Sequence, residues 1–206
     1  ERLSHSRVDA NTALGPIVEH GCDFRAGRRK FGRDDYSIEL TGKGARVMFR
    51  EDTFEGKSVL ITGGGTGIGK KTALEFAAHG ATVGVAARRE EPLQRTVDEI
   101  EEAGGSASWK TVDIREDERV DELVDHFWEE WGRIDVLINN AGANFMSPAA
   151  GITPNGWRTI IDINLNGTFM MSRAVGTKMI ADGKGGRIIN MSATNASNGS
   201  PMISHS

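Results

Sequence analysis

The stretch Lys57–Lys71, KSVLITGGGTGIGKK, decides the fold. It begins with the apolar run Val59–Ile61, which is typical of a strand buried on both faces. Glycines follow at once, and glycine lets the chain turn sharply and brings bare backbone close to a ligand. From Ala73 to Gly80 the apolar residues have helical spacing and the glycine ends the helix. Strand, glycine turn and helix N-terminus are the geometry that binds a pyrophosphate, because unpaired N–H groups and the helix dipole point at the anion.

Strand and helix patterns alternate along the rest of the chain. Further strands are expected at Ala81–Ala86, Ser106–Val112, Ile134–Asn139 and Gly186–Met191. Further helices are expected at Glu91–Ala103, at Glu116–Trp131 and, after a capping Thr153, from Pro154 to about Ile180. This order predicts the α/β class, with a doubly wound parallel sheet (a Rossmann fold) in three α/β/α layers. Ligands of such sheets bind beyond the carboxyl ends of the strands, where the strand order reverses.

The first 53 residues differ from the rest, since they show neither a strand period nor a helix period. We interpret residues 1–53 as a disordered or non-native extension, with Met48 as the expected true start, and residues 54–206 as the folded domain. The basic cluster Arg25–Arg33 could serve as a nucleic-acid arm, but no fold surrounds it and disorder is the favoured interpretation. We expect the domain to be truncated at its C-terminus.

Length and composition exclude several classes of protein. At 206 residues the chain is expected to form one domain, and its net charge of −4 argues against a nucleic-acid partner. The single cysteine, Cys22, excludes an internal disulfide and indicates a reducing compartment. We expect the cytoplasm, with peroxisome and mitochondrion left open. No apolar run approaches the roughly 20 residues of a membrane span, and the histidines lack metal-ligand spacing, so neither a membrane nor a metal is expected.

Two motifs carry a resemblance to a known family. The glycine stretch Thr62–Gly69, TGGGTGIG, resembles the motif of the short-chain dehydrogenase/reductase (SDR) family, and Asn139–Gly142, NNAG, looks like its second hallmark. The resemblance implies a nicotinamide cofactor across the strand ends. The implied cofactor contacts come from the glycine turn, from the end of the third strand and from the second hallmark: Gly63, Gly64, Gly65, Thr66, Gly67, Ile68, Gly69, Asp113, Ile114, Asn140, Ala141 and Gly142.

The end of the second strand bears on the choice of cofactor. An NAD enzyme needs a carboxylate there for the ribose 2′-hydroxyl, but the sequence continues with Arg88 and Arg89. Arginine can bind a 2′-phosphate through two parallel hydrogen bonds. We therefore expect Arg88 to contact the cofactor and NADP(H) to be preferred over NAD(H), the alternative being a solvent-exposed basic helix start.

The chemistry departs from the usual SDR pattern. Most members of the family reduce carbonyls with Ser, Asn and Tyr-x-x-x-Lys, in which the tyrosine gives the proton. Asn164 matches the family's Asn, and Ser192 lies in the serine region. The tyrosine should follow by about thirteen residues, which leads to His205–Ser206, and the only tyrosine of the chain is the distant Tyr36. This departure argues against carbonyl reduction by the usual mechanism.

A second resemblance accounts for the missing tyrosine. The segments Asn144–Pro148 and Ile152–Trp157 look like the corresponding part of 2,4-dienoyl-CoA reductases and peroxisomal trans-2-enoyl-CoA reductases. In that branch a serine, here Ser206, often stands where the tyrosine would be. The ending Pro201–Ser206 resembles the enoyl-CoA reductases most. The dienoyl enzymes use another tyrosine that corresponds here to Asn195, so their mechanism as such is not supported.

The branch implies roles for individual residues. Asn144 would hydrogen-bond the thioester carbonyl. Substrate contacts are implied for Arg115 at the CoA part, for Phe145 in the acyl pocket and for Thr153 before the helix.

The leading prediction is an NADPH-dependent oxidoreductase of fatty-acid metabolism that reduces the C=C bond of an enoyl-CoA or dienoyl-CoA thioester. Hydride addition makes an enolate, whose oxygen needs fixed donors such as an Asn amide. The expected catalytic residues are Asn144, Asn164, Ser192 and Ser206. The alternatives are an ordinary SDR acting on alcohols or ketones and a nucleotide-binding module without catalysis. The full-length enzyme is expected to be a homotetramer, and this stretch alone is expected to be inactive.

Overall fold

The computed structural model describes residue 50, residues 52–193 and residues 202–203. The predictions made for the extension up to residue 49, for Met48 as the start, and for Asn195 and Ser206 lie outside the described residues.

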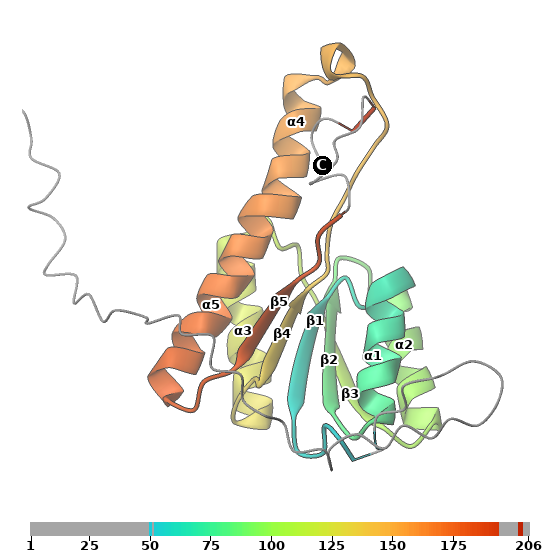
Figure 1. The fold of residues 1–206 in the computed structure, drawn as a ribbon, viewed down its shortest axis with the longest axis vertical. Coiled ribbons are helices and arrows are strands. Elements are labelled where there is room, and N and C mark those ends of the chain that lie inside the picture. The colour runs from blue at the N-terminus through green and yellow to red at the C-terminus, as the bar shows by residue number, and fades with distance from the viewer. Residues whose placement is uncertain (1–49, 51, 194–201, 204–206) are drawn as a thin grey trace, which may run out of the picture. The chain divides into compact units, whose positions relative to one another are not determined.

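Five parallel strands form one sheet (Figure 1). The strands are β1 (Ser58–Thr62), β2 (Thr82–Ala87), β3 (Ser106–Thr111), β4 (Val136–Asn139) and β5 (Arg187–Asn190). Their order is β3-β2-β1-β4-β5, so the chain runs outward from β1 to β3 and then returns to the other side of β1. This reversal confirms the predicted doubly wound parallel sheet and puts its switch point between β1 and β4.

Helices cover both faces of the sheet (Figure 1). The helices are α1 (Gly67–Ala78), α2 (Glu90–Glu102), α3 (Asp117–Trp131), α4 (Pro154–Ile161) and α5 (Thr168–Asp182). One apolar cluster joins α1 and α2 to the sheet, and a second joins α3 and α5 to its other face. The three layers are those expected from the alternating order of strands and helices.

The residues of β1 explain why both faces are covered. Val59 and Ile61 belong to the cluster under α1 and α2, whereas Leu60 belongs to the cluster under α3 and α5. All three side chains are fully buried. Successive side chains of a strand point to opposite faces, so a continuous apolar run requires a layer of helices on each side.

The helix predicted from Pro154 to about Ile180 is present but not uniform. Thr153 caps it as expected, since its hydroxyl accepts the N–H of Gly156 at 3.0 Å and Pro154 takes the first position. Between α4 and α5 the segment Asp162–Gly167 is a π-helix. π-Helical turns occur mainly as single insertions in α-helices and frequently at functional sites.

The outer strand differs from the others in its exposure. All residues of β5 are exposed, and within the described residues β5 pairs with β4 alone. Exposed apolar side chains also occur along α4, the π-helical segment and α5, for example Trp157, Leu165 and Phe169.

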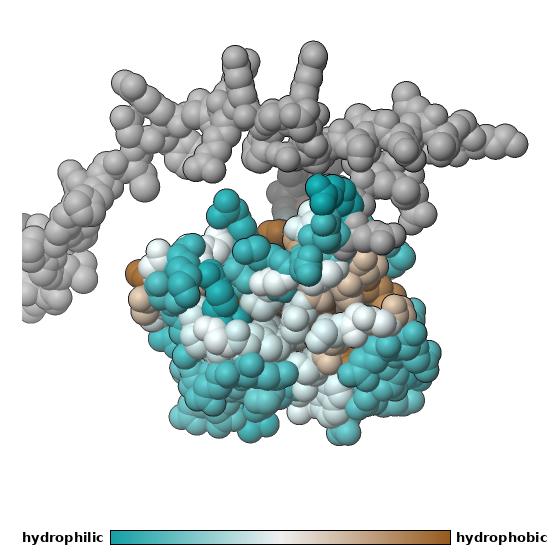
Figure 2. Space-filling model, turned by 90° about the horizontal axis from the view of Figure 1, so that it is seen from below, coloured by the Kyte–Doolittle hydropathy of each residue, from teal (hydrophilic) through white to brown (hydrophobic). Residues whose placement is uncertain are grey.

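The face of the molecule seen in Figure 2 is mainly hydrophilic where it is coloured. In the part of the chain that the structure describes, no helix combines the length and apolar character that a bilayer span requires.

Candidate active site

The glycine turn between β1 and α1 is so tightly packed that several of its residues have no room for a side chain. Gly63 and Gly67 have left-handed φ angles of 69° and 55°. A Cβ on Gly69 would lie 2.3 Å from the carbonyl oxygen of Gly63, and one on Gly64 would lie 2.5 Å from the side chain of Val85. Side chains at these positions would force the strand and the helix apart, so the turn depends on glycine.

The N-terminus of α1 is left open to an anion. The preceding Thr66 makes no side-chain cap to the helix, and the first turn of α1 contains no acidic residue. The free N–H groups and the positive end of the helix dipole thus meet no negative side chain of the helix itself. This end of α1 fits a pyrophosphate.

Side-chain hydrogen bonds tie the glycine turn to the NNAG motif. The Thr62 hydroxyl accepts the backbone N–H groups of Asn140 and Ala141 at 3.1 and 3.0 Å. In return the Asn140 amide donates to the carbonyl oxygens of Thr62 and Gly63 at 3.0 and 3.3 Å. The two motifs, 78 residues apart in the chain, are therefore braced against each other at the switch point.

A first cavity of about 390 Å³ opens beside the glycine turn, a size typical of ligand pockets. Its wall contains nine of the predicted cofactor residues: Gly63, Gly65, Thr66, Arg88, Asp113, Ile114, Asn140, Ala141 and Gly142. Gly64, Gly67, Ile68 and Gly69 are not on the wall.

The wall also contains residues that we did not predict: Ala86, Ala87, Arg89, Pro92, Val112, Ala143 and Ile163. Arg89 could have been found from its position beside Arg88. Pro92 could not, because only the packing of α2 against the glycine turn brings it close; a Cβ on Gly65 would lie 3.0 Å from Pro92.

The charged groups near this cavity are paired in a way that the sequence did not indicate. Arg115 Nε donates to the two carboxylate oxygens of Asp113 at 2.9 and 3.1 Å, and the Arg115 backbone N–H donates to one of them at 3.1 Å. These hydrogen bonds to Arg115, helped by the charge of Arg88, hold the pKa of Asp113 below its ordinary value against the opposing effect of burial.

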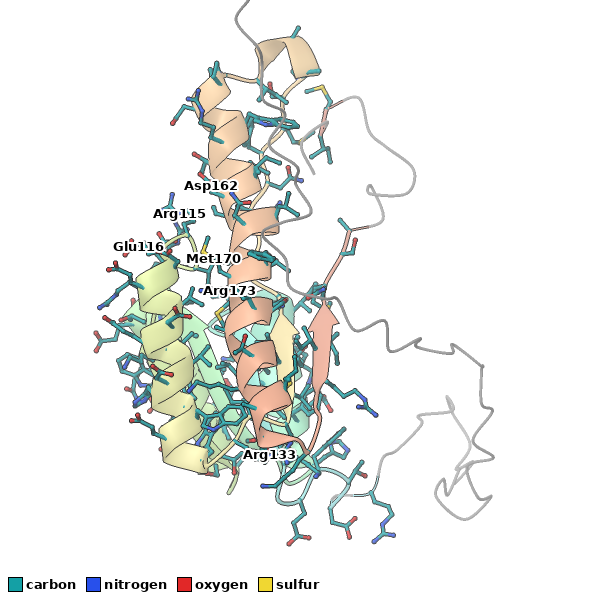
Figure 3. All side chains as sticks on the ribbon, turned by 90° about the vertical axis from the view of Figure 1, so that its left-hand side faces the viewer. Arg115, Glu116, Arg133, Asp162, Met170 and Arg173 are labelled. Atoms are coloured by element: carbon teal, nitrogen blue, oxygen red, sulfur yellow. The ribbon has the colours of Figure 1, made fainter. Side chains whose placement is uncertain are left out.

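The same pairing raises the pKa of Arg115, to which the nearby Glu116 and Asp162 also contribute (Figure 3). Arg115 lies on the wall of neither cavity. Arg115, which we predicted to contact the substrate, is thus paired with Asp113 of the first cavity in this structure.

A second cavity, of about 410 Å³, adjoins the first and shares residues 140–143 with it. Its wall brings together three of the predicted catalytic residues, Asn144, Asn164 and Ser192. Thr168, Met191 and Ala193 also line it and were not predicted. Thr168 lies one helical turn after Asn164, so the periodicity could have indicated that both share a face.

The two asparagines of this cavity differ in what they contact. Both ends of the Asn164 amide contact one residue, since its nitrogen donates to Ala143 O at 3.0 Å and its oxygen accepts Ala143 N–H at 2.8 Å. Asn164 therefore holds the loop after β4 in place through the backbone of Ala143. The next residue, Asn144, is exposed, and within the described residues no hydrogen bond engages its side-chain amide.

The remaining predicted substrate residues lie outside both cavities. The ring of Phe145 packs against Gly156 in the first turn of α4; a Cβ on Gly156 would lie 3.2 Å from the ring. Thr153 uses its hydroxyl to cap that same turn. Both residues contact the first turn of α4, and neither lines the second cavity.

Comparison with known proteins agrees with this geometry. A sequence model of the short chain dehydrogenases matches residues 57–205. A protein of Bacillus subtilis named probable 2,4-dienoyl-CoA reductase is 40% identical over 152 residues, which are 74% of this chain and 60% of the relative. The peroxisomal 2,4-dienoyl-CoA reductase of Arabidopsis thaliana is 37% identical over 153 residues, 71% of this chain and 51% of the relative.

A solved structure, the citronellol catabolism dehydrogenase of Pseudomonas aeruginosa, is 43% identical, with a TM-score of 0.72 and coverage of 77% of this chain and 64% of that one. The chain thus spans between half and two thirds of the length of these relatives. The resemblance read from the two motifs is confirmed over almost the whole described part. The chain belongs to the short-chain dehydrogenase/reductase family of oxidoreductases, which use a nicotinamide cofactor, and is similar to its 2,4-dienoyl-CoA reductases.

Proposed function

We propose that the full-length protein reduces the carbon–carbon double bond of an enoyl-CoA or dienoyl-CoA thioester with NADPH. The observation that carries this proposal is the amide of Asn144 on the wall of the second cavity, which no hydrogen bond within the described residues engages. The one tyrosine of the given sequence, Tyr36, precedes β1 in the chain. An enzyme that protonates a ketone needs a strong proton donor, whereas an enolate needs fixed hydrogen-bond donors. The similarity to proteins named 2,4-dienoyl-CoA reductases supports the same choice.

The first cavity is suited to NADPH. The N-terminus of α1 would hold the pyrophosphate, and Arg88 and Arg89 would bind the 2′-phosphate. Asp113 and Ile114 lie where the adenine would be, and Gly142 offers no side chain on the path toward the second cavity. When bound, the cofactor supplies the hydride.

The second cavity would hold the reacting part of the thioester. Hydride adds to a carbon conjugated to the carbonyl, the double-bond electrons move onto the thioester oxygen, and the Asn144 amide donates to that oxygen. The α-carbon then takes a proton from water or from a hydroxyl such as that of Ser192, which completes the reduction. Asn164 holds Ala143 by two hydrogen bonds and so keeps the neighbouring Asn144 in place.

The substitution Asn144→Ala tests the proposal. A lost oxyanion donor lowers kcat about 10²- to 10³-fold, or roughly 3–4 kcal/mol. NADPH affinity should hardly change, because the side chain faces the substrate. The matched control is Asn155→Ala, which removes an exposed asparagine that lines neither cavity. Steady-state kinetics on enoyl- and dienoyl-CoA substrates, with NADPH titrations, measure both quantities. Loss of NADPH binding together with kcat would make Asn144 a structural loop residue.

A second candidate function is alcohol or ketone chemistry. The similarity to the citronellol catabolism dehydrogenase favours it, as does the presence of Ser192 in the cavity. A simple ketone or alcohol that is turned over faster than every acyl-CoA tried would establish this alternative. A protein that binds NADPH and turns over neither class would be a nucleotide-binding module. The homotetramer and the cytoplasmic location stay predictions from the sequence.

A further inference from the structure

Below the second cavity, three polar side chains from β4, β5 and α5 meet. Asn139, the last residue of β4, is only 4% exposed. Its side-chain nitrogen donates to Asn190 Oδ1 of β5 and to Ser172 Oγ of α5, both at 2.9 Å. The Ser172 hydroxyl donates in turn to the carbonyl oxygen of Thr168 at 2.7 Å. One buried amide therefore links two neighbouring strands and the helix that covers them.

Stability alone does not explain an asparagine at this position. The preceding residues of β4, Val136–Ile138, are apolar, and Asn139 continues the strand with a polar side chain. The oxygen of the Asn139 amide is buried and has no hydrogen-bond partner within the described residues. A buried polar atom without a partner costs about 1–3 kcal/mol. The amide thus has an energetic disadvantage that a purely structural residue would avoid.

The hydrogen bonds of Asn139 lead to the wall of the second cavity in two directions. In one direction, the side chain holds Asn190 and the Asn139 carbonyl oxygen accepts the N–H of Met191 at 2.9 Å. Ser192 is the next residue. In the other direction, Ser172 leads to Thr168, which lines the same cavity. Hydrogen bonds therefore connect both sides of the cavity to one buried side chain, Asn139, at the end of β4.

We propose that Asn139 is a positioning residue, which acts through Asn190 to set the place of the Ser192 hydroxyl in the second cavity. The inference rests on the proposed function in so far as Ser192 takes part in the reaction. Within the described residues no hydrogen bond engages the Ser192 hydroxyl, so its position depends on the backbone that leads to it. That backbone is fastened by Asn139 through one side-chain and one main-chain hydrogen bond.

The substitution Asn190→Ala in the full-length protein removes the acceptor without disturbing the core, because Asn190 is exposed. A displacement of about 1 Å in a reacting group can cost about 100-fold, so kcat should fall about 10- to 100-fold. NADPH affinity should change less than about twofold, since the hydrogen bonds between Thr62 and Asn140 are untouched. Asn190→Asp retains an acceptor oxygen for Asn139 and should restore kcat to within about threefold of wild type.

A double-mutant cycle separates positioning from a general structural effect. If Asn190 acts through Ser192, the double variant Asn190→Ala/Ser192→Ala should have the kcat of Ser192→Ala alone, because no hydroxyl is left to position. The proposal would be overturned if the double variant lost kcat by the product of the two factors that the single substitutions cause. Gln94→Ala is the matched control: its amide also makes two side-chain hydrogen bonds, at 2.6 and 2.7 Å, but on α2 and far from Ser192 in the fold. It should leave kcat unchanged.

The cycle is run with whichever substrate, acyl-CoA, ketone or alcohol, the wild type turns over fastest. A wild type that prefers ketones would contradict the proposed function and leave the positioning role to be judged by the cycle. An active wild type with kcat unaffected by Asn190→Ala would contradict the positioning role alone. A wild type active on none of these classes would overturn both.

Discussion

Arg88 and Arg89 follow β2 directly, and both line the first cavity. Asp113 lies on the same wall, but its carboxylate is occupied by Arg115. The carboxylate of Asp113, on which the charge of Arg88 acts, is thus already paired with another guanidinium, which leaves the positive charge of Arg88 for a phosphate. At the scale of the residue, this arrangement supports the proposed preference for NADPH.

The substitution Arg88→Asp should reverse that preference. It removes a charge-assisted hydrogen bond worth about 1.5–3 kcal/mol and adds a like charge, so NADPH should bind about 10- to 100-fold more weakly or worse. NADH binding should be kept or improved, since a carboxylate can accept the ribose 2′-hydroxyl. Fluorescence titration with both cofactors measures the change. Arg95→Asp, on the exposed face of α2 and outside the cavity, is the control. An unchanged ratio of the two affinities would refute the assignment.

At the scale of the element, the π-helical segment Asp162–Gly167 determines what Asn164 can do. A π-helical turn holds more residues than an α-helical turn, so it shifts the side chains before it relative to those after it. Here the segment directs Asn164 onto Ala143. Gly167, at its other end, is so close to Ile114 of the first cavity that a Cβ would lie 2.7 Å from that side chain. The segment therefore touches residues of both cavities.

Replacing Asn164 should consequently affect catalysis through the loop after β4. Asn164→Ala leaves the N–H and the C=O of Ala143 without these partners, and we expect kcat to fall by about 10-fold or more with little change in NADPH affinity. The control is Asn166→Ala, which removes the 2.9 Å hydrogen bond from Asn166 to Asp162 in the same segment and does not touch the loop. If both variants lose the same activity, the segment matters as a whole and Asn164 has no special role.

At the scale of the whole molecule, the face of the sheet that α3 and α5 cover is packed to a different tightness at two glycines. Gly84 of β2 faces α3, and a Cβ there would lie 2.4 Å from Trp131 and 2.9 Å from Phe127. Gly176 lies in α5, where the nearest atom to an added Cβ, on Ile188, is 3.7 Å away. The same chemical change at these two positions therefore has opposite physical consequences.

Gly84→Ala should destabilise the fold by about 1–3 kcal/mol, because the aromatic side chains of α3 must move to admit the methyl group. Gly176→Ala should stabilise it by about 0.5–1 kcal/mol, because alanine loses less conformational entropy than glycine in a helix. Urea unfolding of the full-length protein, with each variant as the other's control, measures both free energies. If both substitutions raised, or both lowered, the free energy of unfolding, the packing described for α3 and α5 would be contradicted.

The order of strands and helices could be predicted from the sequence, and so could the two motifs of the site. Strand β1 and the glycine turn are encoded by an apolar run and by glycines within fifteen residues, Lys57–Lys71. The cap at Thr153 with Pro154 is equally local. Such features follow from backbone sterics and from hydrophobic period, which act over a few neighbouring residues.

Only the tertiary structure decided which side chains are partners. Asn139 meets Asn190 and Ser172 across 51 and 33 positions of the chain, a relation that depends on strand order and register. The engagement of Asn164 depends on a π-helical turn, and apolar spacing did not separate that turn from the α-helices around it. Arg115 has the sequence position of a substrate residue, yet it is bound to Asp113. Local sequence specifies backbone conformation, whereas a side chain's partner depends on distant segments that packing alone brings within hydrogen-bond distance.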